Sequence, residues 1–346
     1  MNISKWFLII FVLYIAGYFS HALFLGKTVF GDGRFYYSWV KSTVIDFQLP
    51  QPNKYTIGPA IAWAPAVAWT HTLVRGTGYE FPYQFFVGAT SVLFSIAGLV
   101  LMFRLLRSYY TPTISLLTTL SIAFATNLYF YGSLDPVNSH ALSFFAATVF
   151  LNMLHFQKNS FLTGLSLGFV GLMRTQDLIY ALAIKKVRIL PCLAGFFLGF
   201  LPQLIAWQVV NGKFWMSPYL SGSEGFNFFQ PHILEVLFSY RSGLFFWTPI
   251  LLLGLIGLWF SKLNIWLKII VFVQIFLVST WSTWWQGASY SGRMFVSILP
   301  IFALGLGYMY TWLWKKTWRE FYYFYVFIVP LSLLNMLLII YFLLIT

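Results

Sequence analysis

Long apolar runs separated by short polar segments follow one another along the whole chain of 346 residues. A membrane-spanning helix needs about 20 mostly apolar residues. Most of the runs reach this length without interruption, but the stretch 161–184 is interrupted by the polar run Arg174 to Asp177. We expect that stretch to form two short helices that meet at a polar apex. The pattern predicts an all-α polytopic membrane protein with about eleven transmembrane helices, in a single domain over 1–346. The uninterrupted runs lie at 6–25, 84–103, 114–131, 138–157, 189–210, 244–261, 266–285, 294–314 and 322–345.

The run 57–75 is also apolar enough to span, but it contains Pro59, Pro65 and His71. Basic residues decide its placement, because short cytoplasmic loops are enriched in Lys and Arg. We expect a juxtamembrane helix here that does not span, with two sizeable outer segments at 26–83 and 211–243. Seven of the eight acidic residues then face the outside. This topology places 12 of the 21 basic residues in cytoplasmic loops, namely Lys5, Arg104, Arg107, Lys158, Lys185, Lys186, Arg188, Lys262, Lys268, Lys315, Lys316 and Arg319.

Composition narrows the class of protein further. Only 8% of the residues are charged and 60% are hydrophobic, whereas soluble domains usually have about 25% charged residues. A water-soluble enzyme, a disordered chain and a nucleic-acid-binding module are therefore excluded, and the net charge of +13 is interpreted through topology and contact with membrane lipids. The single cysteine, Cys192, excludes an intramolecular disulfide. The residues contain no metal-ligand spacing, so we expect neither a metal nor a cofactor.

A candidate carboxylate, Asp32, lies between Gly31 and Gly33 just beyond the first predicted span. Flanking glycines permit tight backbone turns, and a carboxylate near membrane depth usually has a partner or a function. The position favours a carboxylate that projects into a cavity. The alternative is an ordinary helix N-cap or turn residue at the interface.

Two arginines, Arg241 and Arg293, precede spans at the outer helix mouths. Such placement opposes the positive-inside pattern, which indicates binding of an anion such as a lipid phosphate. The alternative is a salt bridge to Glu235, Glu224 or Asp32.

Three further polar residues are candidates for contacts with such a ligand. Lys54 opens the 57–75 helix and is a further candidate for the phosphate, although its own context favours interfacial snorkelling. His140 stands at the mouth of the span after Asp135 and is also a candidate for the phosphate. Arg174 is a candidate substrate contact, unless it pairs with Asp177. Tyr36, Tyr55 and Trp285 are candidate substrate contacts, Trp285 by stacking on a sugar unless it belongs to an aromatic belt.

Taken together and in order, these segments resemble the GT-C superfamily of integral-membrane glycosyltransferases, in particular bacterial members related to protein O-mannosyltransferases and aminoarabinose transferases. The resemblance covers nearly the whole chain. Each motif is weak alone, and the ordered set is fairly specific. The segments are Gly31–Tyr37, Asn53–Pro59, Arg104–Arg107, Pro136–Phe144, Gly171–Gln176, Arg241–Pro249 and Trp284–Arg293.

The resemblance implies a GT-C fold with juxtamembrane helices in the first outer loop. It also implies a polyprenyl-phosphate sugar donor, an acceptor glycan, lipid or protein, and an active site facing the periplasm or exterior of the inner membrane. Its catalytic carboxylate matches Asp32, which would act as general base in an inverting transfer. The O-mannosyltransferases have Asp-Glu here, whereas Gly33 follows Asp32. Two other functions stay open: a transporter or flippase of a lipid-linked sugar, and a non-catalytic lipid-binding subunit of an envelope-assembly complex.

Overall fold

The computed structural model describes residues 2–49, 54–157, 159–215, 217, 224–317 and 324–345. The protein is 75% helical, and its described residues form no β-sheet beyond one isolated bridge between Phe226 and Trp281. The prediction of an all-α protein is confirmed.

Within the described residues, five helical segments are long and apolar enough to cross a membrane. Most of the surface of Ile3–Leu25, Ile189–Asn211 and Val326–Ile345 faces away from the protein interior. Large apolar side chains such as Phe24, Leu190 and Leu344 are exposed on these segments. A wide apolar surface of this kind suits contact with lipid. The segments are α1 (Ile3–Leu25), α4 (Phe81–Leu106), α8 (Ile189–Asn211), Arg293–Trp314, which contains a 3-10 turn (Arg293–Ile298) and most of α13 (Leu299–Thr317), and Val326–Ile345, which contains α15 (Val329–Ile345).

The described part of the chain also contains five shorter apolar helices: α5 (Pro112–Phe124), α6 (His140–Phe156), α7 (Ser160–Met173), α11 (Ile250–Phe260) and α12 (Ile265–Thr280). The stretch 161–184 divides as predicted, because α7 ends before Arg174 and a 3-10 helix covers Thr175–Ala183. The run 244–261 is divided as well, into α10 (Leu244–Trp247) and α11. Pro249 lies at this break, where its missing N–H prevents a continuous helix.

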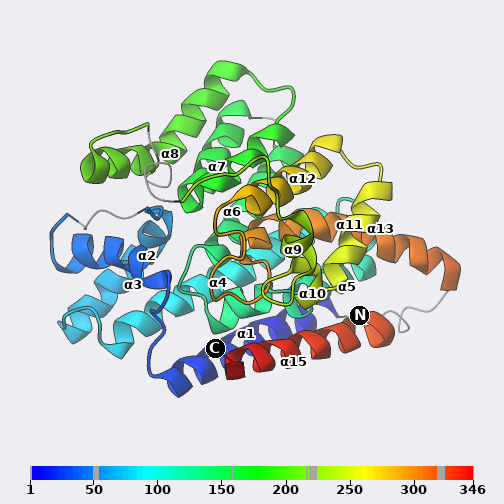
Figure 1. The fold of residues 1–346 in the computed structure, drawn as a ribbon, viewed down its shortest axis with the longest axis horizontal. Helices are drawn as coiled ribbons and strands as arrows, with labels where there is room; N and C mark the ends of the chain where they lie inside the picture. Colours follow the sequence, from blue (N-terminus) through cyan, green and yellow to red (C-terminus); the bar gives the residue numbers. More distant parts are fainter. Residues whose placement is uncertain are drawn as a thin grey trace.

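The segment after α1 folds at one end of the bundle. It contains α2 (Gly33–Val40), a π-helical turn (Lys41–Ile45) and α3 (Gly58–Val74), which lie together at the left of Figure 1, at the end of α1 opposite the N-terminus. A helix of 17 residues is about 26 Å long. α3 packs against α2, α4 and α7, and its position along the membrane surface stays a prediction.

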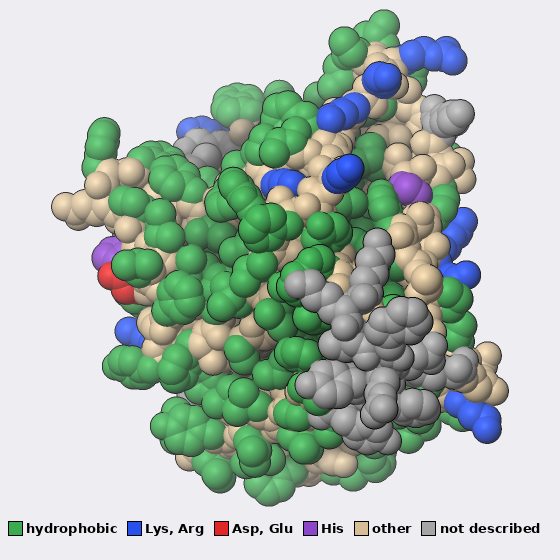
Figure 2. Space-filling view, turned by 90° about the vertical axis from the view of Figure 1, so that its right-hand side faces the viewer, with side chains coloured by type: hydrophobic (Ala, Val, Ile, Leu, Met, Phe, Trp, Pro, Cys, Tyr) green, Lys and Arg blue, Asp and Glu red, His purple; other side chains and the backbone are tan. Residues whose placement is uncertain are grey.

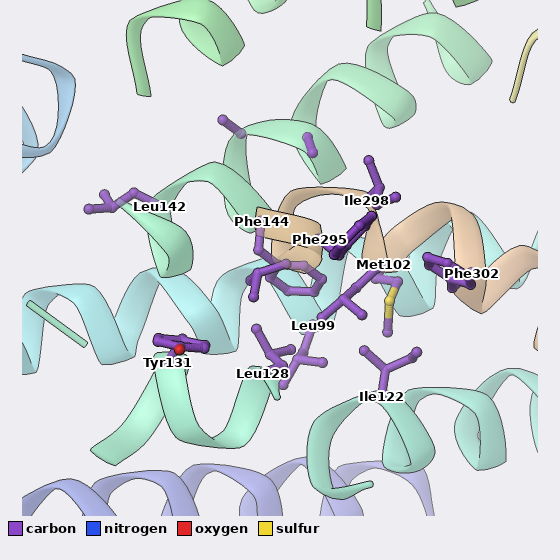
Figure 3. Close-up of a cluster of buried hydrophobic side chains, with 14 of the residues drawn as sticks. Leu99, Met102, Ile122, Leu128, Tyr131, Leu142, Phe144, Phe295, Ile298 and Phe302 are labelled. Carbon is purple, nitrogen blue, oxygen red and sulfur yellow. The ribbon is translucent and has the colours of Figure 1, made fainter. Parts of the chain in front are cut away.

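The core lies where α4, α5 and α6 meet the chain around residues 293–302. Leu99 and Met102 of α4 face Phe144 of α6 and Phe295 and Phe302 there, and all are fully buried (Figure 3). The pair α7 and α8 packs even more closely, because a Cβ on Gly164 would lie only 1.8 Å from the Cys192 carbonyl oxygen. Small residues allow two helix backbones this approach. A short helix, α9 (Ile233–Phe238), contacts α10 and α12.

Figure 2 shows the face of the bundle on the right-hand side of Figure 1. Lys and Arg side chains gather on its upper part, whereas acidic side chains are scarce on it. Hydrophobic side chains cover much of the rest.

Candidate functional site

The backbone around Asp32 depends on both neighbouring glycines. Gly31 has φ of +52°, in the left-handed region that glycine tolerates best. Gly33 lies against the chain before α6, where an added Cβ would be only 2.1 Å from the Val137 carbonyl oxygen. The Gly-Asp-Gly sequence therefore turns the chain tightly and fixes the start of α2 against the loop at Val137.

The Asp32 carboxylate contacts two side chains, the guanidinium of Arg293 and the hydroxyl of Tyr55. Its Oδ2 lies 2.9 Å from Nη1 of Arg293, and its Oδ1 accepts a hydrogen bond of 2.8 Å from the Tyr55 hydroxyl. Asp32 occupies the N-cap position of α2, yet its side chain makes no capping hydrogen bond. Desolvation, and the adjacent Asp32 carboxylate, raise the pKa of Tyr55 above its usual value. The Tyr55 hydroxyl therefore keeps its proton and donates it in the hydrogen bond to Asp32.

Aromatic side chains surround this carboxylate. The Tyr55 ring stacks on Phe35 with centroids 5.2 Å apart and meets the Tyr36 ring edge-on at 4.8 Å. The buried Tyr36 hydroxyl donates to Ser139 Oγ at 2.9 Å, at the start of α6. These contacts connect α2, the chain before α3 and the α6 N-terminus into one wall.

Arg174 lies in the same region, at the break that follows α7. It is 7% exposed, and its guanidinium contacts His140 Nδ1 at 3.2 Å and the Met294 sulfur. The ion pair with Asp177 that the sequence left open does not form, since Ser297 Oγ donates to Asp177 Oδ1 at 2.7 Å instead. Throughout the described ranges, no carboxylate lies within ion-pair distance of Arg174.

A second carboxylate, Asp135, stands in the loop before α6, within electrostatic reach of Arg293 and Asp32. Withdrawal from solvent raises the pKa of Asp135 to about 7; Arg293 opposes this shift and Asp32 adds to it. Asp135 is therefore a second carboxylate near the ion pair of Asp32 with Arg293, and it comes from a different part of the chain.

Two predicted anion-binding residues lie apart from the Asp32 carboxylate. Lys54 Nζ forms a 2.6 Å ion pair with Glu224, which joins the first long inter-helix segment to the second. Arg241 is exposed and lies over the Trp285 ring, 5.2 Å from its centroid. The structure therefore brings together Asp32, Arg293, Tyr55, Tyr36, Arg174 and His140. Lys54 lies at the edge of this cluster, with Nζ 5.8 Å from the centroid of the Tyr55 ring, and Arg241 and Trp285 lie outside it.

A cavity of about 290 Å³ opens beside the cluster. Tyr36, Arg174 and Met294 line it, together with Gln274 of α12 and Gln286. The sequence analysis missed both glutamines. Their signal was an uncharged amide within or beside an apolar run, which is costly in a membrane unless it is paired or functional.

Within the described residues, no three His, Cys, Asp or Glu side chains are grouped closely enough to hold a metal ion. No family model matches the chain, and no curated protein matches it. The resemblance to GT-C glycosyltransferases therefore stays a prediction.

Proposed function

We propose that the protein is a glycosyltransferase that moves a sugar from a polyprenyl-phosphate donor to an acceptor hydroxyl. The observation that carries the proposal is the Asp32 carboxylate, held by Arg293 and Tyr55 beside a cavity that contains a buried arginine. Perturbed or paired ionisable groups that converge on a pocket are typical of active sites. The apolar helices around them suit a substrate with a prenyl chain.

In the proposed reaction, Asp32 takes the proton of the acceptor hydroxyl. The acceptor oxygen then attacks the anomeric carbon, and the bond from that carbon to the phosphate oxygen breaks with its electron pair on the phosphate. The product is a glycoside of inverted configuration and free polyprenyl phosphate. A positioned base of this kind typically contributes about 10²–10⁴-fold to the rate.

The leaving phosphate needs neutralisation rather than a proton. Arg293 can hold Asp32 and neutralise the phosphate at the same time, because its guanidinium has five N–H donors and its buried Nε has no partner among the described residues. Arg241 is exposed at the neighbouring surface and suits the approach of an anionic headgroup.

The proposed arrangement in the membrane is the eleven-span GT-C topology, in the inner membrane with the site on the periplasmic or outer side. The twelve basic residues assigned to short loops support this orientation. Apart from the prenyl donor, the partners are membrane lipids and a glycan, lipid or protein acceptor.

The break at Arg174 favours one competing function, a transporter or flippase of a lipid-linked sugar. Transporters place interrupted helices and buried charges at their substrate sites. A non-catalytic lipid-binding subunit is the remaining alternative, in which Asp32→Asn would leave function intact.

The test uses the purified full chain with polyprenyl-phosphate sugars and candidate acceptors. We expect release of free polyprenyl phosphate, with at least a 100-fold loss in Asp32→Asn. Asp46→Asn is the matched control, because Asp46 pairs with Lys41 at 2.7 Å and lies outside the cluster. Equal release by the wild type and Asp32→Asn would refute the role of the base. No release by any form, with sugar-lipid movement across proteoliposomes, would indicate a transporter.

A further inference from the structure

The cavity beside Asp32 has an unusual charge pattern among its described lining residues. Arg174 is its charged member, and the remaining side chains are amides, hydroxyls, aromatic rings and apolar groups. The other lining residues are Tyr36, Thr56, Thr175, Gln176, Ser217, Phe226, Gln274, Leu277, Val278, Trp281, Thr283, Gln286 and Met294.

Two buried amides in this lining each use one of their two polar ends. Gln286 Oε1 accepts the Met294 backbone N–H at 2.9 Å, and its Nε2 has no partner in the described part of the chain. Gln274 Nε2 donates to the Met294 carbonyl at 2.7 Å, and its Oε1 likewise has none. Leaving a buried polar group unpaired is unfavourable. The amides therefore offer a donor and an acceptor to a ligand with both kinds of group.

Arg174 adds a cation to the same wall. No carboxylate in the described ranges lies within ion-pair distance of it, and the buried Asp177 acts on it only from a longer distance. The oxygen atoms of a ligand would therefore supply the direct contact that a buried guanidinium needs. The Phe226 and Trp281 rings, which also line the cavity, meet edge-on with their centroids 4.7 Å apart. Aromatic faces combined with amides and a few hydroxyls suit a sugar ring.

We propose that this cavity receives the glycosyl group of the donor, that it selects a sugar bearing hydroxyl or carboxylate groups and no amine, and that Arg174 determines this specificity. The inference rests on the proposed glycosyl transfer and names its substrate class. An ammonium about 6 Å from the guanidinium, at an effective dielectric constant of about 20, is disfavoured by about 100-fold in binding.

The experiment measures binding rather than turnover. Short-chain prenyl phosphates carrying a neutral hexose, a hexuronate or a 4-amino-4-deoxypentose are titrated into the detergent-solubilised full chain, and dissociation constants are obtained from calorimetry. We expect the amino sugar to bind about 100-fold more weakly than the neutral and acidic ones. Arg174→Gln should reduce this difference to a few-fold.

A second variant tests the proposal by adding a negative charge to the cavity lining. Gln286→Glu keeps the acceptor for the Met294 N–H and adds a carboxylate, so the amino sugar should gain affinity. Gln203→Glu is the matched control. Gln203 is fully buried, accepts the Ile57 N–H at 2.9 Å and has no partner for Nε2 among the residues that the structure describes, but it does not line the cavity. This variant should leave the selectivity unchanged. Thermal unfolding establishes that each variant is folded, and Arg174→Gln alone decides if the glutamate variants are not.

Equal binding of the three sugars by the wild type, unchanged selectivity in Arg174→Gln, or no binding of any sugar would overturn the inference. Selective binding without transfer would refute the proposed enzyme activity and leave the inference standing. Transfer that ignores the amine would refute the inference and leave the activity standing.

Discussion

The contact between Gly33 and Val137 gives a direct test of how the Asp32 carboxylate is positioned. In Gly33→Ala, the new Cβ would start 2.1 Å from the Val137 carbonyl oxygen, whereas such contacts are essentially never shorter than 3.0 Å. The two backbones must therefore separate by at least 0.9 Å, the difference between 3.0 and 2.1. Asp32 directly precedes this residue, so its carboxylate moves relative to Arg293, its partner at 2.9 Å. A misplacement of about 1 Å costs about 100-fold in rate.

The assay compares the release of free polyprenyl phosphate by Gly33→Ala, the wild type and Gly31→Ala. Gly31 is the matched control, because its φ of +52° makes alanine strained by about 1–2 kcal/mol but an added Cβ meets nothing within 4 Å. We expect Gly31→Ala to melt at a lower temperature with its rate within a few-fold of the wild type, and Gly33→Ala to lose both stability and rate. A folded Gly33→Ala that works at the wild-type rate would show that this contact does not position Asp32.

Three further predictions concern stability. The pKa of Asp135 is about 7 in the folded protein and about 3.9 in the unfolded chain, so between these pH values the native state binds the proton more strongly, and the free energy of unfolding should fall by up to about 4 kcal/mol as pH rises. Thermal melts at several pH values should show this dependence in the wild type and not in Asp135→Asn. The same pH dependence in both proteins would contradict the assignment. Gly164→Val should unfold the α7–α8 pair, because its side chain meets the Cys192 carbonyl, whereas Gly225→Val, in open space, should melt like the wild type; similar melting of the two variants would be evidence against close backbone packing. Lys54→Glu should speed proteolysis near Glu224, because it breaks an ion pair worth about 1 kcal/mol or less. The double variant with Glu224→Lys should restore protection. If it does not, the ion pair does not form.

The fold was predictable where the sequence pattern is local. The break at Arg174 followed from four polar residues inside an apolar stretch, and α7 and the 3-10 helix meet there. The break at Pro249 was missed, although a proline inside a predicted span carried the signal. Length alone suggested one continuous helix at that position.

The site was predictable only as separate residues. Asp32 was identified by its glycines and Arg293 by its position against the charge bias. A salt bridge to Asp32 was one of three pairings that the sequence left open for the arginines, and the choice among them depends on how the start of α2 packs beside the chain before α13. Lys54 shows the converse, since its own context suggested interfacial snorkelling or a phosphate and the fold gave it Glu224. Pairing between distant segments is set by tertiary packing, which local sequence patterns do not encode.

The length of α7 has a consequence for the surrounding bilayer. Its 14 residues extend about 21 Å, against a hydrocarbon thickness of about 30 Å. A helix of this length that begins at one boundary places Arg174 about 9 Å short of the other. In the proposed transfer, the lipid-anchored donor would then reach this arginine from within the hydrocarbon region. Bilayer thickness becomes a control variable, because shorter acyl chains bring Arg174 nearer to water and longer ones leave it deeper.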